Sequence, residues 1–380
     1  MRVAHIISEY SRHEAMGRTI AETVARVPGE HSLIAARIHD GEAAFHSVHE
    51  VGGGFTTFAF SRQQQIAEAL DAIRPDIVHV HGGALAPLWA TSSALRRRKV
   101  TMSIYGWPRI PRPSALRHAT WHQLTRSNVL RARVVLSTLL PAAVSRRVLR
   151  LTGVGSVLSP DPDARHRLAD SGVPVLPLPS GAAISSLRAQ PTSTEPVILF
   201  AGRAEMVRGI DTVLAAFTLV RRSVPDARLR LLLIPTAELP QIEAAIANAG
   251  LGTACTVTTE PVADLDAELA AAQVGAWPFK FDYTTSPPAM ALAEAMAVGL
   301  PVVATDVTCV RSIAQHDHNA LLVPVADATA LAAAMVSVLT DRGRWQRLST
   351  AGLHTIEHDA SWAAAAAQTQ IAYDHALVAA

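Results

Sequence analysis

The feature that most constrains the fold is a repeated alternation of short apolar runs with longer amphipathic stretches. A first series of apolar runs lies at residues 3–7, 76–81, 100–105, 132–137, 154–159 and 173–178. After a polar stretch at 190–196, a second series lies at 197–202, 229–234, 255–259, 274–279 and 301–306. Short apolar runs between helical patterns are typical of βαβ units, which form parallel sheets. The sequence therefore predicts an α/β fold with two doubly wound, Rossmann-like domains.

Length and composition agree with two globular domains. A chain of 380 residues exceeds one ordinary core, and 49% of its residues are hydrophobic while only 17% are charged. No apolar run reaches the roughly 18 residues that a membrane span needs. Glu9 comes too early for a secretory signal, and the two cysteines, Cys255 and Cys309, lack metal-ligand spacing. We expect a cytoplasmic protein with domains at 1–188 and 189–360.

Charge is distributed unevenly along the chain, although the formal net charge is only +2. Residues 77–160 contain no Asp or Glu but thirteen cations, all of them within the basic region 96–150. An Arg-rich composition explains the choice of Arg over Lys but leaves the missing carboxylates unexplained. Such a segment should attract anions, so an anionic acceptor or peripheral membrane contact is an open possibility. No nucleic-acid partner is expected.

The segment at 286–299 predicts a helix with an anion site at its start. Ser286 is a good N-cap, Pro287 suits the first helical position, and Gly299 ends the helix. Free backbone N–H groups and the helix dipole favour an anion there. The donors would be the Ser286 hydroxyl and the amides of Ala289, Met290 and Ala291.

Glu294 is a lone acid on an apolar helix face, eight residues beyond Ser286. It lies about 12 Å along the predicted axis, a span that suits a diphosphate at the helix start and a ribose at the carboxylate. The alternative is a buried Glu paired with an Arg.

A second candidate anion site follows the first strand of the second domain. Arg203 ends that strand, and Arg208 precedes the next helix. Two guanidiniums five residues apart could hold a diphosphate from two sides. Two solvated loop arginines are the simpler alternative.

These residues resemble the motifs of retaining GT-B glycosyltransferases of the glycosyltransferase 4 type. GRAEMVRGID (202–211), SPPAMALAEAMAVGLPVVATD (286–306) and HNALLVPVADATALAAAM (318–335) carry the specific likeness. RPDIVHVHGG (74–83) and LPLPSGA (176–182) fit weaker patterns. The resemblance implies a GT-B architecture, two domains facing a central cleft. It also implies that a carboxyl-terminal helix, 361–380, crosses back onto the first domain and is anchored by Trp362.

The resemblance also assigns roles. Arg203 and Arg208, the latter replacing the usual Lys, would bind the donor diphosphate and promote its departure, and Glu294 would hold the ribose. Ser286 stands where the family has its first Glu, and Tyr105 stands where a His normally contacts the donor sugar. The remaining expected contacts are Gly17 from a glycine-rich loop, His81 on the acceptor side, and the base-reading loop Glu260, Pro261 and Val262.

Metal and dinucleotide signals are weak. Asp161-Pro162-Asp163 imitates a D-x-D motif, but its position after a strand favours an N-cap. His79 and His81 share one strand face, but a zinc site needs further ligands, which the sequence does not place nearby. No G-x-G-x-x-G is complete. We expect neither a metal nor a cofactor.

The leading hypothesis is a metal-independent retaining hexosyltransferase. It would use a GDP- or UDP-linked sugar and a saccharide, lipid-linked or anionic acceptor. The alternatives are a catalytically inactive nucleotide-sugar-binding protein, which the changes at Ser286 and Tyr105 favour, a nucleotide-sugar 2-epimerase, for which catalytic carboxylates are not evident, and a peripheral membrane module.

Overall fold

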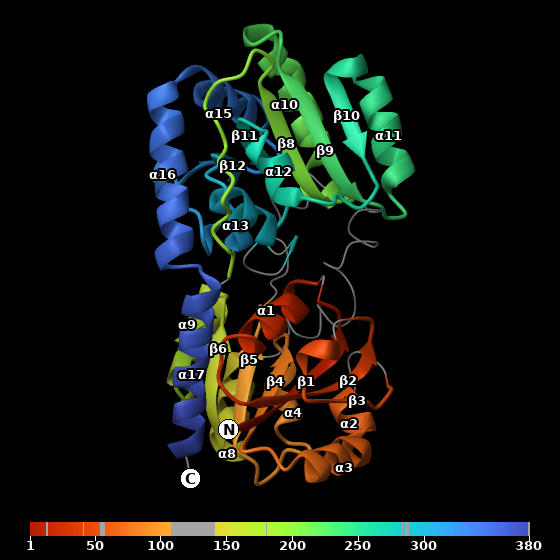
Figure 1. Ribbon diagram of the computed structural model, residues 1–380, viewed down its shortest axis with the longest axis vertical. Coiled ribbons are helices and arrows are strands. Elements are labelled where there is room, and N and C mark those ends of the chain that lie inside the picture. The colour runs from red at the N-terminus through yellow and green to blue at the C-terminus, as the bar shows by residue number, and fades with distance from the viewer. Residues whose placement is uncertain are drawn as a thin grey trace. The chain divides into compact units, whose positions relative to one another are not determined.

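The computed structural model describes residues 1–12, 14–40, 42–53, 58–107, 141–179, 181–282, 284–285 and 289–378 (Figure 1). These residues form two compact units. The described parts of the first unit are 1–107, 141–181 and 362–378, and those of the second lie within 182–361. The division after Gly181 precedes the expected one after 188 by seven residues.

The first unit contains a seven-stranded sheet in which all pairings are parallel. Its strand order is β3 (Ser47–Glu50), β2 (Glu30–Ile38), β1 (Arg2–Tyr10), β4 (Ile77–Gly82), β5 (Val100–Ile104), β6 (Val154–Ser159) and β7 (Val175–Pro177). The chain moves outward from β1 to β3, then returns to β4 on the other side of β1. The strand order therefore switches direction between β1 and β4, a position that binds ligands in doubly wound folds.

The helical segments of the first unit lie mostly between consecutive strands. They are η1 (Glu42–Ala44), α1 (Ala15–Val24), α2 (Phe58–Ser61), α3 (Gln63–Ile73), α4 (Ala86–Trp89), α8 (Ala142–Thr152), α9 (Pro162–Leu168) and η3 (Ala169–Ser171). The sequence-distant helix α17 (Trp362–Val378) also belongs to this unit. It packs along β6, as Figure 1 shows.

Small residues allow α17 to lie directly on the sheet. A Cβ on Gly155 would stand 2.4 Å from the Cα atom of Ala376, so the strand needs glycine there. Beside it, the Ser156 hydroxyl donates to the Ala372 carbonyl at 2.8 Å. Trp362 is buried at the other end of the helix, over Gly181. These contacts give the alanine-rich tail its place in the first unit.

The second unit contains a six-stranded sheet, also parallel throughout. Its order is β10 (Cys255–Thr258), β9 (Arg228–Ile234), β8 (Val197–Arg203), β11 (Val274–Trp277), β12 (Val302–Thr305) and β13 (Ala320–Val323). Its helical segments are η4 (Met206–Arg208), α10 (Ile210–Ser223), α11 (Leu239–Asn248), η5 (Gly252–Ala254), α12 (Leu265–Ala270), α13 (Met290–Ala297), α14 (Thr308–Arg311), α15 (Ala328–Thr340) and α16 (Arg342–His358).

One continuous apolar core holds the second unit together. It includes the inner strands, whose residues are almost entirely buried, together with the inward faces of α10, α13, α15 and α16. The buried Trp277 donates its indole N–H to the Ala201 carbonyl at 2.9 Å, which links β11 to β8 at the centre of the sheet. A rigid core thus supports the loops that leave these two strands.

The predicted strand positions are partly confirmed. Ten of the eleven apolar runs overlap an observed strand, and the remaining run, 132–137, lies outside the described residues. Strands β2, β3 and β13 were not predicted. None of the described helices has the length and apolar character required to cross a membrane.

Candidate functional site

The candidate site in the second unit lies where its strand order changes direction. β8 and β11 are neighbours, and the chain leads outward from them on opposite sides. Because all strands are parallel, the loops that follow β8 and β11 leave the same edge of the sheet. Ligands of doubly wound domains bind beyond this edge, next to the switch.

Arg203 and Arg208 converge on a single carboxylate at this edge. Arg203 ends β8, and its Nε lies 3.3 Å from Oε1 of Glu205. Arg208 ends η4, and its Nε lies 3.1 Å from Oε2 of the same residue. The Arg203 side chain is 47% exposed and that of Arg208 15%. Two guanidiniums therefore share one anion, an arrangement that could also bind phosphate oxygens.

Backbone bonds hold the arginine-bearing loop in place. The buried Glu238 accepts from the Met206 amide at 2.8 Å, and the Lys280 amide donates to the Val207 carbonyl at 3.1 Å. Gly209 has φ +83°, and a Cβ there would lie 1.9 Å from the Pro278 carbonyl oxygen. The loop after β8 is thus packed against the segment that follows β11, and only glycine fits at their contact.

A second ion pair joins the same two segments. Nζ of Lys280 lies 2.5 Å from a carboxylate oxygen of Asp211 at the start of α10. The Lys280 side chain is only 4% exposed. Lys280 therefore links the segment after β11 to the start of α10. Because its charge is paired with Asp211, it is not a free cation for a ligand.

The helix predicted to start at Ser286 begins later in the structure. Its first residue is Met290 and its N-cap is Ala289, so the expected Ser286 cap is wrong; residues 286–288 lie outside the described residues. The Ala289 amide donates to the Cys309 carbonyl at 3.2 Å, so this amide is already hydrogen-bonded and is not available to an anion. Met290 and Ala291 remain in the first turn, where amides lack intrahelical partners.

The charge of Arg208 acts on Cys309, which contacts the start of this helix. Burial raises the pKa of the Cys309 thiol to about 12, and the Arg208 charge acts in the opposite direction. Cys309 also supports the helix start, because its carbonyl accepts from Ala289. The Arg208 charge therefore acts on the residue whose carbonyl holds the start of α13.

Glu294 lies nearer the helix start than expected, and the base-reading loop follows β10. Glu294 is half-buried in the second turn of α13 and has an interaction partner. Because the helix starts later than expected, Glu294 lies about 7.5 Å along the axis from the cap. Glu260, Pro261 and Val262 form the connection between β10 and α12, with Glu260 and Pro261 exposed and Val262 half-buried.

Gly17 has a clear structural role in the first unit. It is buried in α1, and a Cβ there would lie 2.0 Å from the Ser11 carbonyl oxygen. Close packing of α1 on the end of β1 explains this glycine without a ligand, so its expected contact with the donor stays a prediction.

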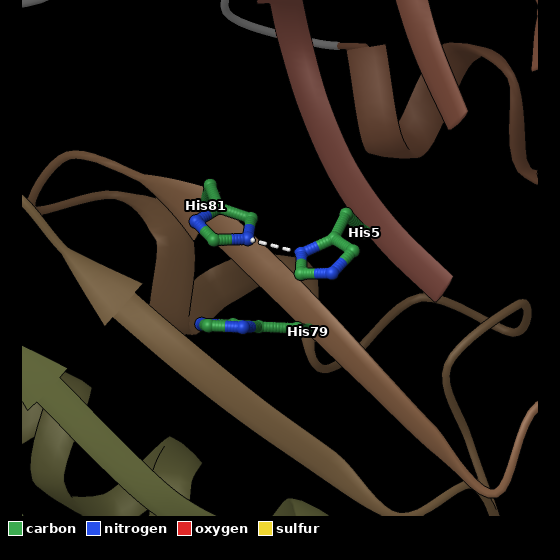
Figure 2. Close-up of side chains that lie close together, drawn as sticks. All are labelled: His5, His79 and His81. Carbon is green, nitrogen blue, oxygen red and sulfur yellow. Dashed lines mark hydrogen bonds between the residues drawn. The ribbon is translucent and has the colours of Figure 1, made fainter. Parts of the chain in front are cut away.

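Tyr105 and His81, expected to contact the sugars, are buried in a polar network. Tyr105 is 6% exposed and His81 3%. The Tyr105 hydroxyl lies 3.1 Å from Nδ1 of His81, whose Nε2 lies 3.0 Å from Nδ1 of His5 (Figure 2). Both ring nitrogens of His81 are thus occupied by protein groups. Direct acceptor contact by His81 is not supported by this geometry, because no ring nitrogen remains available for a ligand.

The network continues in both directions from Tyr105 and His81. Nε2 of His5 lies 2.9 Å from Nδ1 of His31, and Nε2 of His31 lies 2.9 Å from the Val27 carbonyl oxygen. In a second branch, Nδ1 of His79 lies 2.8 Å from the hydroxyl of Tyr373 in α17, and Nε2 of His79 lies 2.8 Å from the hydroxyl of Ser103. The Ser103 hydroxyl in turn bonds the Tyr105 side chain. Eight groups therefore form one continuous chain from Tyr373 in α17 to Val27, three residues beyond the end of α1.

The Val27 carbonyl fixes the direction of this chain, since it can only accept. His31 must donate through Nε2, so its Nδ1 accepts from His5, and the same reasoning assigns an Nε2–H tautomer to His5 and His81. Tyr105 must then donate to His81. Burial lowers the pKa of His79 to about 3 and holds those of His5 and His81 well below the ordinary value, with further lowering by neighbouring histidines. The imidazoles are neutral, as the chain requires.

The structure supplies the third histidine that the sequence did not place. Ligand atoms of His5, His79 and His81 lie within 4.8 Å of one another, so the expectation that no further ligand is near is wrong. The donors nonetheless suit a metal poorly. All six ring nitrogens are hydrogen-bonded, and the group contains no carboxylate to offset a buried divalent charge.

Asp161 is confirmed as an N-cap. Its carboxylate accepts from the Asp163 amide at 2.9 Å at the start of α9 and from the Trp107 amide at 2.8 Å. Asp161 is fully buried, and burial raises its pKa. The D-x-D pattern therefore has a structural explanation.

The basic region is partly described. Arg98 pairs with Asp71 at 2.6 Å and Arg146 with Asp170 at 3.5 Å, whereas Arg96, Arg97 and Arg147 are exposed. The arginines at 109, 112, 117, 126, 131 and 133 lie outside the described residues.

Three residues of these sites were missed at first. Glu205 stands between the two arginines in sequence, a signal that could have identified it. His5 and His31 carried no such signal, since their proximity to His81 depends on β1 lying between β2 and β4.

Comparisons with known proteins agree with the fold. Residues 195–341 match the family model described as "Glycosyl transferases group 1". A stretch of 73 residues is 42% identical to a probable sucrose-phosphate synthase 5 of Oryza sativa subsp. japonica. That stretch is 19% of this chain and only 7% of the rice protein.

Solved structures resemble the whole chain. Sucrose-phosphate synthase from Thermosynechococcus elongatus has a TM-score of 0.73 at 17% identity, with full coverage of both chains. Anabaena HepE, solved with UDP and glucose, has a TM-score of 0.70 at 14% identity over 98% of both chains. At these identities the likeness shows the fold. Residues 195–341, which hold the arginine pair and α13, thus match the model of the group 1 glycosyl transferases, and the whole chain has the GT-B glycosyltransferase fold.

Proposed function

We propose that the protein is a retaining glycosyltransferase that moves a hexosyl group from a nucleoside diphosphate sugar to a saccharide or anionic acceptor. The observation that carries the proposal is the convergence of Arg203 and Arg208 on one carboxylate beside α13. Two cations that share an anion at the carboxyl edge of a group 1 domain suit a diphosphate leaving group.

The arginines would act mainly on the departing diphosphate. Cleavage of the glycosidic bond leaves negative charge on the phosphate oxygens, and fixed cations stabilise that charge without reorganisation. No described residue is assigned as a nucleophile, and front-face attack by the acceptor accounts for retention without one. Because arginines and first-turn amides supply the positive charge, catalysis needs no divalent metal.

UDP is the preferred donor nucleotide in this proposal, and GDP is the alternative. Support comes from the likeness to HepE, whose structures contain UDP, UDP-glucose and glucose. The exposed Arg96, Arg97 and Arg147 would favour an anionic acceptor or peripheral membrane contact on the cytoplasmic side.

A thermal-shift panel tests donor binding. UDP, GDP, ADP and their glucose or mannose derivatives are added in EDTA, and a ligand at 100 times its Kd adds about 2.7 kcal/mol to stability. We expect UDP or GDP to raise the Tm and Arg203→Ala to abolish the shift. No shift with any nucleotide would reject the proposal.

The second candidate is an inactive nucleotide-sugar-binding protein. It is favoured by the burial of Tyr105, whose hydroxyl is committed to His81 instead of a sugar. Sugar release from the donor separates the two: slow hydrolysis or transfer identifies an enzyme, and tight binding with neither identifies a binding protein.

A further inference from the structure

We propose that Glu205 is the resident anion of the diphosphate site, an internal carboxylate that every phosphate ligand must displace. The inference rests on the proposed function, since it assigns the ligand class of the same arginine pair. It adds a determinant of affinity and product release that the arginines alone do not provide.

The conformation of Glu205 supports this role. Glu205 is the N-cap of η4, yet its side chain makes no capping hydrogen bond. Its two oxygens instead go to different guanidiniums, Oε1 to Arg203 and Oε2 to Arg208. The carboxylate thus occupies the position between the cations where phosphate oxygens would bind.

Glu205 can also leave this position at low cost. Its pair with Arg203 is partly exposed, with side-chain accessibilities of 24% for Glu205 and 47% for Arg203, whereas Arg208 in the other pair is 15% exposed. Exposed pairs of this kind contribute little to folding. The loop backbone is held independently, by Glu238 on the Met206 amide and by the Val207 carbonyl bond to Lys280. Displacement therefore requires a side-chain rotation only.

An intramolecular competitor lowers the affinity of all displacing ligands by a common factor. Its effective concentration is high because it is attached two residues from one arginine and three from the other. Weak anions such as carboxylates and single phosphates then fail to bind at ordinary concentrations, whereas a diphosphate with additional contacts still binds. The same carboxylate returns to the arginines when the nucleoside diphosphate departs, which favours product release.

Calorimetric titration of Glu205→Gln with inorganic pyrophosphate, UMP and UDP tests the proposal. The variant removes the competing charge and keeps the side-chain size. We expect each ligand to bind roughly three- to tenfold tighter than to wild type, the range expected from loss of two weak ion pairs. UDP should also become a stronger product inhibitor. Glu205→Ala should also bind these ligands more tightly than wild type. Tm measurements establish that both variants fold.

Glu243→Gln is the matched control. Glu243 is exposed on α11, and its substitution changes the net charge equally without touching the arginines. We expect unchanged affinities. If Glu205→Gln binds more weakly than wild type, Glu205 orders the arginines instead, and if affinities are unchanged it is a bystander; either result overturns the inference.

The diphosphate site and the role of Glu205 can be rejected separately. If UDP and pyrophosphate bind neither wild type nor Glu205→Gln, or if Arg203→Ala leaves their binding unchanged, the diphosphate site itself is rejected. If Arg203→Ala abolishes binding while Glu205→Gln does not strengthen it, only the role of Glu205 is rejected.

Discussion

Arg203 is the residue for which function and stability separate most clearly. Its side chain is about half exposed and pairs only with Glu205 among the described residues. Arg203→Ala should therefore leave the Tm within a degree or two, while turnover of UDP-glucose falls at least tenfold. Loss of one fixed charge contact costs up to about 3 kcal/mol of transition-state stabilisation.

Steady-state kinetics with UDP-glucose measure this effect. Arg222→Ala, which removes an exposed cation at the end of α10, serves as the control and should retain full turnover. Wild-type turnover in Arg203→Ala would contradict the assigned role.

Tyr105 and Tyr10 offer a matched pair for the buried network. Tyr105→Phe leaves Nδ1 of His81 without its donor and should lower the free energy of unfolding by about 1–3 kcal/mol. The Tyr10 hydroxyl is buried without a hydrogen-bond partner among the described atoms, so Tyr10→Phe should cost nothing. Urea unfolding of both variants provides the measurement. If Tyr105→Phe and Tyr10→Phe unfold with equal free energies, the hydrogen-bonded histidine chain contributes little to stability.

Side-chain chemistry was predictable where sequence neighbours carry it. The arginine pair and the Asp161 cap are local features, and their positions follow from motif spacing. The histidine chain was not predictable, because it needs β1, β2 and β4 in their spatial order and α17 on the sheet. Ser286 likewise could not reveal that the N-cap is Ala289, three residues after it.

At the level of elements, glycine determines how α17 docks. Gly155→Ala places a methyl group 2.4 Å from the Cα atom of Ala376, so the helix must move away from β6. We expect a loss of about 1–3 kcal/mol in stability and faster amide exchange along α17. Gly83→Ala is the control, since a Cβ at Gly83 meets no atom within 4 Å. Slow exchange of α17 in Gly155→Ala would refute this docking model.

The strand predictions succeeded and failed for one reason. Inner strands of parallel sheets are continuous apolar runs, which made β4, β5, β8 and β11 recognisable. β2 begins with the polar Glu30, His31 and Ser32, although His31 and Ser32 are buried. Its polar positions are satisfied by hydrogen bonds to side chains, so hydrophobicity alone could not identify it.

On the scale of the whole molecule, the two units differ in their response to acid. The neutral histidine chain lies entirely in the first unit, whereas the second unit is built around a continuous apolar core. Lowered imidazole pKa values mean that the unfolded first unit binds more protons than the folded one between about pH 3 and pH 6.5. Stability of this unit therefore rises with pH across that window and is lost as pH falls below 6.5.

The size of this effect follows from proton linkage. For His5, His79 and His81 together, lowering the pH from 7.5 to 5.5 should remove about 4 kcal/mol from the first unit. Amide hydrogen exchange at the two pH values, corrected for intrinsic rates, should show lost protection in β1, β4 and β5 while β8, β11 and β12 remain protected. Replacing the exposed His354 and His358 by Gln should not alter the difference, because these side chains lie in the second unit, outside the buried histidine chain. Equal loss of protection in both sheets would mean that buried imidazoles do not set the acid limit, and that general charge repulsion does.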